Sequence, residues 1–231
     1  MIRGMKYGTI ILFGASSGIG LAAAKHFSKS CEKIITVSRR PSPIGEWIKT
    51  DLTKAKDIED LSKKIGEQAI DALLYLGGTW ETNAFTPDYD FETCSDFDIE
   101  TVLNVNLLAP IRVIQRLLPN LKKSQNAKII IIGAAIGGLN LNKSREVSNT
   151  SSKFGLRGLV FSLRQTLSKH KIGITLINPG NVATEEVLSD LQKEGKDETD
   201  AIPLADLFQV METVLTLSNR TNITEIDLPN L

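Results

Sequence analysis

The stretch Y-G-T-I-I-L-F-G-A-S-S-G-I-G, residues 7–20, decides the fold of this chain. Residues 9–13 form an apolar, β-branched run typical of a buried parallel strand. Gly14, Gly18 and Gly20 follow at once and lead into a helix-like sequence. Such a turn binds phosphate, because glycines let the backbone approach closely and the unpaired N–H groups of a helix N-terminus attract negative charge. Glycines also serve packing in tight turns, but this place, directly after a first strand, predicts a nucleotide site.

The bulk composition excludes several classes of protein. The 231 residues carry 27 basic and 27 acidic side chains, which leaves no net charge for binding nucleic acid or an anionic membrane. Cys31 and Cys94 are isolated and lack metal-ligand spacing, so we expect reduced thiols and no metal site. The first strand begins too early for a signal peptide, and no apolar run approaches the ~20 residues of a membrane span. We therefore expect a cytoplasmic protein.

Strand-like and helix-like segments alternate along the whole chain. This order predicts an α/β fold, here a single-domain, Rossmann-type, doubly wound parallel sheet of about seven strands flanked by helices on both faces. Because no linker, repeat or low-complexity tract interrupts the pattern, residues 1–231 are expected to form one domain. The expected strands are residues 9–13, 33–38, 47–50, 70–76, 128–132, 172–177 and 223–228.

Three of the expected helices bear on the site. A helix over residues 53–68 would be capped by Thr53. A long helix over residues 99–123 contains Pro110, which should bend it or lock its packing. A third, over residues 150–168, carries a broad apolar face. In such a sheet, ligands bind at the carboxyl ends of the strands, where the glycines and short polar residues of this chain gather.

Five motifs occur in one order along the chain. They are F-G-A-S-S-G-I-G at 13–20, D-L at 51–52, L-G-G at 76–78, V-N-L at 105–107 and N-P-G-N-V-A-T at 178–184. With these motifs the chain resembles the short-chain dehydrogenase/reductase family over nearly its whole length. The first motif resembles the family's T-G-x-x-x-G-I-G cofactor turn, with Phe13 in place of threonine.

The resemblance implies one dinucleotide-binding domain with a nicotinamide cofactor across the carboxyl edge of the sheet. The cofactor-binding residues that it implies are Gly14, Ser16, Ser17, Gly18, Ile19, Gly20, Ser38, Arg39, Arg40, Asp51, Leu52, Gly77, Gly78, Asn106, Lys153, Pro179, Gly180, Val182 and Thr184. Ser38, Arg39 and Arg40 end the second strand, where an acidic residue would repel a 2′-phosphate. Two guanidinium groups instead suit phosphate oxygens, so we expect NADP(H) to be preferred over NAD(H).

The chain departs from the family at the catalytic positions. The family's mechanism uses a tyrosine that gives or takes the carbonyl proton, a lysine four residues later and a serine after the fifth strand. The lysine is present as Lys153, but the tyrosine position holds Asn149 and the serine position falls on Ala134. An amide does not titrate usefully, although Asn149 can donate a hydrogen bond to an oxyanion. Lys153 could act as the acid if burial lowered its pKa, or could bind ribose alone.

Three functions fit these residues. The first is an NADP(H)-dependent oxidoreductase that acts on a carbonyl or alcohol by a variant mechanism, with Asn106, Asn149 and Lys153 as catalytic residues. The second is a catalytically silent NADP(H)-binding protein with a sensing or assembly role. The third is a non-redox enzyme that uses the same pocket for elimination or isomerisation. The loss of both hydroxyl groups favours the second, whereas the intact nicotinamide end favours the first. A pocket enclosed by Trp80, Phe85 and residues 182–203 would support catalysis, and an open or filled pocket would count against it.

The expected partners are a small-molecule substrate and a second copy of the chain. In most relatives, the helices that carry the residues equivalent to Asn106 and Lys153 form contacts between subunits. The apolar face over residues 154–167 is compatible with such contacts, although it would also serve burial on the sheet. We expect a homodimer or homotetramer.

Overall fold

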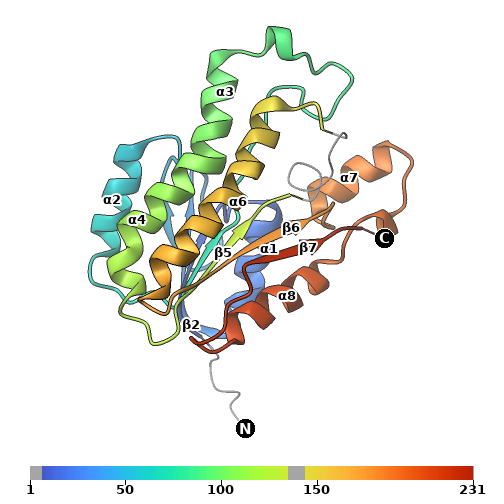
Figure 1. Cartoon of the computed structure of the whole chain (residues 1–231). Helices are drawn as coiled ribbons and strands as arrows, with labels where there is room; N and C mark the ends of the chain where they lie inside the picture. The colour runs from blue at the N-terminus through green and yellow to red at the C-terminus, as the bar shows by residue number, and fades with distance from the viewer. Residues whose placement is uncertain (1–6, 135–143, 231) are drawn as a thin grey trace.

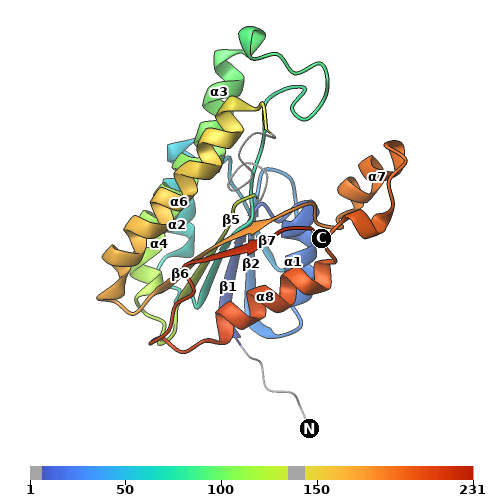
Figure 2. The same cartoon turned by 45° about the vertical axis from the view of Figure 1, so that its right-hand side comes forward.

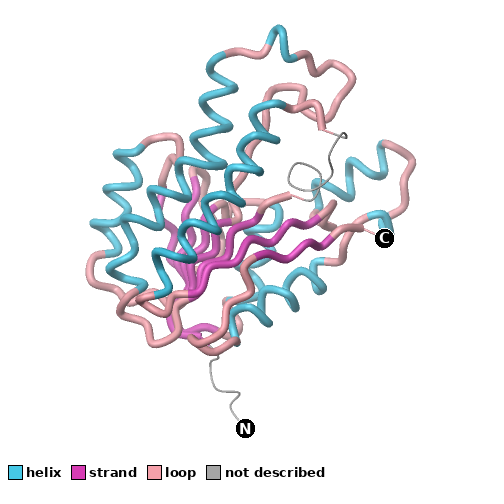
Figure 3. The backbone as a smooth tube through the Cα atoms, in the orientation of Figure 1, coloured by secondary structure: helices cyan, strands magenta, loops and turns pink. Residues whose placement is uncertain are grey.

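The computed structural model describes residues 7–134 and 144–230. The strands in these ranges are β1 (Tyr7–Phe13), β2 (Cys31–Ser38), β3 (Glu46–Lys49), β4 (Ala72–Tyr75), β5 (Lys128–Ile132), β6 (Gly173–Pro179) and β7 (Glu225–Leu228). They form one parallel sheet, as the sequence predicts (Figure 3). The order of the strands in the sheet is β3-β2-β1-β4-β5-β6-β7. The order reverses between β1 and β4, the switch point at which sheets of this type bind ligands.

Helices cover both faces of this sheet. They are α1 (Gly18–Phe27), α2 (Ala55–Ile65), α3 (Asp96–Leu103), α4 (Ala109–Leu121), α6 (Val147–Ser168), α7 (Glu185–Lys193) and α8 (Leu204–Thr216). α2, α4 and α6 lie on one face, and α1 and α8 on the other (Figures 1 and 2). None of the described helices is both long enough and apolar enough to cross a membrane.

The alternation of side chains along the strands divides the core into two layers. Ile11 and Phe13 pack on the side of α2, α4 and α6, whereas Ile10 and Leu12 pack on the side of α1 and α8. Successive side chains of a strand point to opposite faces, and here both faces are covered. This double burial explains why β1 and β5 are continuous apolar runs in the sequence rather than alternating ones.

The predicted start of α2 is wrong. The helix begins at Ala55, and Thr53 does not cap it. Instead, the carboxylate of Asp51 accepts hydrogen bonds from the Thr53 N–H at 3.1 Å and from the Thr53 hydroxyl at 2.8 Å. A short acidic side chain stabilises such a turn by bonding the backbone two residues on, and this bond competes with helix capping.

The expected long helix over residues 99–123 is interrupted beside a predicted site residue. α3 ends at Leu103, and Asn104–Leu108 form a π-helical turn before α4. The N–H of Ala109 donates to the Asn104 carbonyl, five residues back. Pro110 accounts for the interruption, because proline has no N–H and its ring crowds the carbonyl four residues earlier.

A buried tyrosine of β4 holds this π-helical turn in place. The hydroxyl of Tyr75 donates to the Val105 carbonyl at 2.6 Å, and its ring stacks on Phe13 with 5.7 Å between ring centres. Tyr75 is 1% exposed, so no water can replace this bond. The position of the turn therefore depends on a contact with the sheet as well as on Pro110.

We predict that Tyr75→Phe lowers the free energy of unfolding by about 1–3 kcal/mol, because it leaves the buried Val105 carbonyl without its partner. Chemical denaturation measures this loss. Tyr7→Phe is the matched control: the Tyr7 hydroxyl is buried without a hydrogen-bond partner among the described residues, so its removal should be neutral or stabilising. Equal losses in both variants would contradict the assignment.

Candidate functional site

The glycine turn after β1 has the shape of a phosphate cradle. Gly14 and Gly18 take positive φ values of 83° and 52°, a conformation that favours glycine. A Cβ atom on Gly14 would lie 2.6 Å from the Cα atom of Gly77, and one on Gly20 would overlap the Gly14 carbonyl. The side chain of Ser17 makes no cap bond at the start of α1, which leaves helix N–H groups for a ligand. These residues therefore fit the pyrophosphate of a dinucleotide.

Arg40 reaches this turn from the end of β2. Its guanidinium lies 3.4 Å from the Ser17 hydroxyl. The hydroxyl of Ser38 donates to the Arg40 carbonyl at 2.6 Å and accepts from the Trp47 indole N–H at 3.2 Å. Ser38 is buried and shapes the strand end, whereas the side chains of Arg39 and Arg40 are exposed and able to meet a phosphate.

Asp51 and Leu52 flank the same edge of the sheet. Burial acts to raise the pKa of Asp51, but hydrogen bonds from Thr53 and two nearby cations outweigh burial and lower the pKa below its usual value. Leu52 is buried, and its side chain lies 3.5 Å from the place that a Cβ atom on Gly77 would occupy. The segment after β3 is thus packed against the end of β4, next to the glycine turn.

Asn106 is held at the centre of a buried hydrogen-bond network. The Thr79 N–H donates to Asn106 Oδ1 at 2.9 Å, and Asn106 Nδ2 donates to the Thr79 carbonyl at 2.8 Å. Asn106 Nδ2 also lies 3.1 Å from Ser152 Oγ and 3.4 Å from Asn149 Oδ1. The network therefore joins the end of β4 to the first turns of α6 and brings two predicted catalytic residues into contact.

Lys153 completes this group from α6. Its Nζ atom lies 3.5 Å from the Ile132 carbonyl at the end of β5. A Cβ atom on Gly78 would lie 3.6 Å from Lys153 Nζ and 3.7 Å from Asn106 Oδ1, so all three residues border one space. Burial lowers the pKa of Lys153 to about 8. An ammonium group with that pKa can exchange a proton near neutral pH.

The segment after β6 closes the same edge. Pro179 ends the strand, and a Cβ atom on Gly180 would overlap the side chain of Asn230, which would have to move. Val182 is buried, which makes it a packing residue in this structure. The hydroxyl of Thr184 accepts the Val187 N–H at 3.4 Å and caps α7. The cofactor contacts expected of these four residues stay predictions.

Three other residues predicted from the sequence make fewer contacts that bear on the site. Ser16 lies half-buried in the glycine turn, and Ile19 packs against the core on the side of α1 and α8. Ala134 follows β5, as predicted for the serine position, and has no hydroxyl. The rest of that loop, residues 135–143, lies outside the described residues.

Tyr89 lies beside the start of the predicted catalytic helix. Its hydroxyl accepts the Val147 N–H at 3.1 Å, at the start of α6. Burial raises the pKa of Tyr89, and the carboxylates of Glu81 and Glu146 raise it further. A proton donor needs the opposite shift, so Tyr89 does not replace the missing tyrosine.

Sequence reasoning missed three residues that hold the site together: Thr79, Glu81 and Ser152. Ser152 is fully buried one helical turn after Asn149, a spacing that could have indicated it. Thr79 acts through its backbone, and Glu81 reaches α6 from a distant segment. No local pattern in the sequence marks either of these two.

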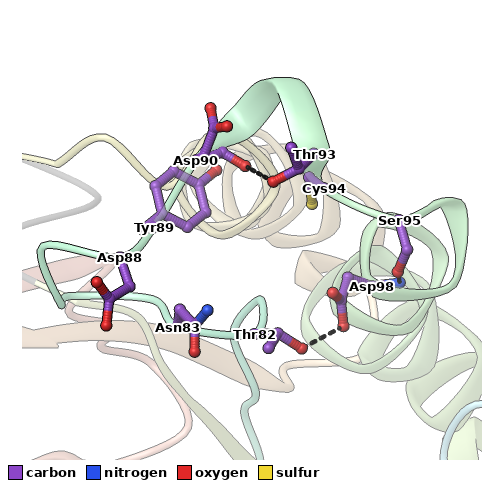
Figure 4. Close-up of a pocket in the computed structure, with 9 residues that line it drawn as sticks. All are labelled: Thr82, Asn83, Asp88, Tyr89, Asp90, Thr93, Cys94, Ser95 and Asp98. Carbon is purple, nitrogen blue, oxygen red and sulfur yellow. Dashed lines mark hydrogen bonds between the residues drawn. The ribbon is translucent and has the colours of Figure 1, made fainter.

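The segment between β4 and α3 carries a cavity of about 160 Å³, which none of the predicted site residues lines (Figure 4). Trp80 and Phe85 pack edge to face with 5.9 Å between ring centres, but they are 60% and 56% exposed. The part of the chain that the structure describes therefore leaves these two rings uncovered, unlike the enclosed pocket considered above. The cavity is lined by Thr82, Asn83, Asp88, Tyr89, Asp90, Thr93, Cys94, Ser95 and Asp98.

Comparison with known proteins identifies relatives over almost the whole chain. The family model described as short chain dehydrogenase matches residues 8–195. An uncharacterized oxidoreductase of Staphylococcus epidermidis is 26% identical over 94% of this chain and 95% of its own length. A short chain dehydrogenase of Penicillium roqueforti is 28% identical over 76% of this chain and 70% of its own length.

Solved structures show the same fold. A short chain dehydrogenase of Salmonella enterica serovar Typhi superposes with a TM-score of 0.82 at 21% identity, covering 98% of both chains. A protein of Shigella flexneri described as a short chain dehydrogenase, complexed with NADP, has a TM-score of 0.80 at 19% identity over 96% of both chains. A third, from Escherichia coli and complexed with NADPH, has a TM-score of 0.79 at 21% identity over 95% of both chains.

The lowered pKa of Lys153 predicts a pH-dependent stability. Between pH 8 and 10.5, the unfolded chain holds the Lys153 proton while the folded chain releases it, so the free energy of unfolding rises with pH. Lys153→Met, which cannot titrate, should be more stable than the parent below pH 8. The difference should shrink by at most about 1.4 kcal/mol per pH unit above pH 8 and stop changing near pH 10.5. Denaturation of both proteins across this range measures it, and a constant difference would contradict it.

Proposed function

We propose that this chain, which belongs to the short chain dehydrogenase family, is an oxidoreductase that uses NADP(H) to interconvert a carbonyl and an alcohol by a variant mechanism. One observation carries the proposal: Asn106, Asn149 and Lys153, whose pKa is lowered by burial to about 8, lie together at the carboxyl edge of the sheet. Further support comes from the glycine cradle and from similar structures that are complexes with NADP and NADPH.

The mechanism assigns a role to each polar side chain of this group. Because Asn106 Nδ2 donates to Asn149 Oδ1, the amide N–H groups of Asn149 are left to donate to a substrate oxygen. Lys153 gives a proton to that oxygen during reduction and takes it back during oxidation, as its pKa near 8 permits. A bound nicotinamide supplies or accepts the hydride.

The choice of NADP(H) rests on the end of β2. No carboxylate stands at Ser38 to repel a 2′-phosphate, and Arg39 and Arg40 present exposed guanidinium groups beside the glycine turn. A guanidinium group binds phosphate through two parallel hydrogen bonds, each strengthened by charge. We infer that these two arginines hold the 2′-phosphate.

Calorimetry with NADPH and NADH tests the cofactor assignment. We expect tighter binding of NADPH, and Arg40→Glu should weaken NADPH binding about 10- to 100-fold, the worth of one charge-assisted hydrogen bond. NADH binding should change little. Arg220→Glu is a matched control, because Arg220 is exposed and precedes β7 at the opposite edge of the sheet. Failure of the parent protein to bind either cofactor would refute the proposal.

Turnover of NADPH with activated carbonyl compounds tests the chemistry. Lys153→Ala should lower kcat by about 10²-fold or more, the usual loss on removing a positioned acid. Lys169→Ala, at an exposed lysine that ends α6, should leave kcat unchanged.

Asn149 and Ala134 stand where the family has its catalytic tyrosine and serine. This loss of two hydroxyl groups favours a second candidate function, that of a catalytically silent NADP(H)-binding protein. Tight cofactor binding without turnover, and no gain in the double variant Asn149→Tyr, Ala134→Ser, would favour it over the oxidoreductase.

We further propose that the chain forms a homodimer or homotetramer through α4 and α6. These helices lie side by side with no other layer over them (Figure 1). Large apolar side chains are exposed there, including Ile111 of α4 and Phe154 and Phe161 of α6. A stable interface needs about 800 Å² from each partner, which two helices can supply.

Sedimentation analysis tests this assembly. The parent protein should sediment as a dimer or tetramer, and Phe161→Lys should shift it toward the monomer because the change places a charge in the interface. Phe97→Lys, at an equally apolar but separate exposed side chain of α3, is the control. A monomeric parent protein would refute the proposal.

The two cysteine thiols of the chain indicate a reducing compartment. Cys31 and Cys94 are both free, and we propose a cytoplasmic location on that basis. Fractionation of cells that express the chain would test it: recovery of the chain with exported proteins would refute it.

A further inference from the structure

A carboxylate from a distant segment meets the start of α6. Glu81 Oε1 accepts the backbone N–H of Ser148 at 2.7 Å and that of Asn149 at 3.1 Å. These two N–H groups are among the four that a helix N-terminus leaves without an intrahelical partner. The residue at the cap position itself, Glu146, makes no side-chain cap bond. The cap of α6 therefore comes from a residue that precedes it by more than 60 positions.

If Glu81 served only as a helix cap, its burial would lower the stability of the fold more than an ordinary cap does. Glu81 is 1% exposed, and its second oxygen, Oε2, is buried without a hydrogen-bond partner among the described residues. Burying a charged group with an unsatisfied oxygen is unfavourable, whereas a serine or asparagine on the helix itself could cap the same N–H groups without it. A role beyond capping would explain why a carboxylate stands here.

The place of Glu81 in the chain suggests that role. Thr79, two residues earlier, exchanges two backbone hydrogen bonds with the side chain of Asn106. Glu81 bonds the backbone of Asn149. One short segment after β4 thus holds both asparagines, and it sets the 3.4 Å contact between Asn106 Nδ2 and Asn149 Oδ1. Because that contact engages Asn149 Oδ1, the N–H groups of the Asn149 amide are left for a substrate.

We propose that Glu81 is a positioning residue that holds Asn149 in register with Asn106, so that the amide N–H groups of Asn149 point to the substrate oxygen. The proposal rests on the oxidoreductase function proposed above. In this role, Glu81 supports the asparagine that stands where the family has its tyrosine. Glu81 itself touches neither cofactor nor substrate.

Kinetics of three Glu81 variants tests the proposal. Glu81→Ala removes the acceptor and should lower kcat for an activated carbonyl about 10²-fold, the effect of a displacement of about 1 Å, with KM for NADPH unchanged. Glu81→Gln keeps an acceptor oxygen in place and should restore kcat to within a few fold of the parent. If Glu81→Ala fails to fold, Glu81→Asp, whose side chain is one methylene shorter, should show the same loss.

Glu146→Ala is the matched control for lost stability. The Glu146 carboxylate accepts the Phe85 N–H at 2.8 Å beside the same helix start, but among the described residues its side chain makes no hydrogen bond to Asn106 or Asn149. We expect Glu146→Ala to lower the melting temperature while kcat per folded molecule is kept. An equal loss of kcat in Glu146→Ala and Glu81→Ala would overturn the proposal, because it would reduce Glu81 to a structural role.

A spectroscopic readout separates this proposal from the proposed function. The side-chain amide resonance of Asn149, identified by its absence in Asn149→Asp, should shift in Glu81→Ala and stay in place in Glu146→Ala. This measurement needs no turnover, so it supports or refutes the role of Glu81 even if the parent protein proves silent. An unmoved resonance in folded Glu81→Ala would overturn the proposal.

Discussion

The arrangement of the site depends on one buried side-chain amide. Asn106 exchanges two hydrogen bonds with the backbone of Thr79 and also lies against Asn149 and Ser152. A buried polar group that loses its partner costs about 1–3 kcal/mol, so these bonds specify one arrangement of three elements rather than several. Asn106 therefore fixes the relative positions of three segments: the end of β4, the π-helical turn and the start of α6.

The chemistry available at this point differs from that of a hydroxyl group. A side-chain amide donates and accepts hydrogen bonds but does not carry a proton between reactants, so Asn149 can polarise a bond without acting as an acid. Lys153 is a titratable group on the same helix, and burial shifts its pKa toward neutrality. In the proposed mechanism, hydrogen bonding and proton transfer, which a tyrosine combines, are divided between two residues one helical turn apart.

Local patterns predicted much of the fold and of the cofactor edge. β1, the glycine turn and α1 are adjacent in sequence, and their propensities agree with one another, so their structure follows from a short stretch. The same local reasoning failed at Thr53, where a hydrogen bond to Asp51 competes with the helix cap. It also gave only half of the answer at Pro110: the proline indicated a disturbed helix, but the π-helical form of the turn involves Tyr75 from the sheet.

The sequence by itself determined the succession of strands and helices along the chain, the glycine turn after β1 and the residues that stand where the family has its catalytic tyrosine and serine, because these follow from periodicity, glycine spacing and motif order. The tertiary structure alone decided how Asn149 and Lys153 are presented. The Glu81 carboxylate that accepts the Asn149 N–H comes from 68 residues earlier in the chain, and the burial that shifts the pKa of Lys153 exists only once β5 and α6 have packed. Hydrogen bonds and desolvation act through space, and no spacing along the chain encodes them.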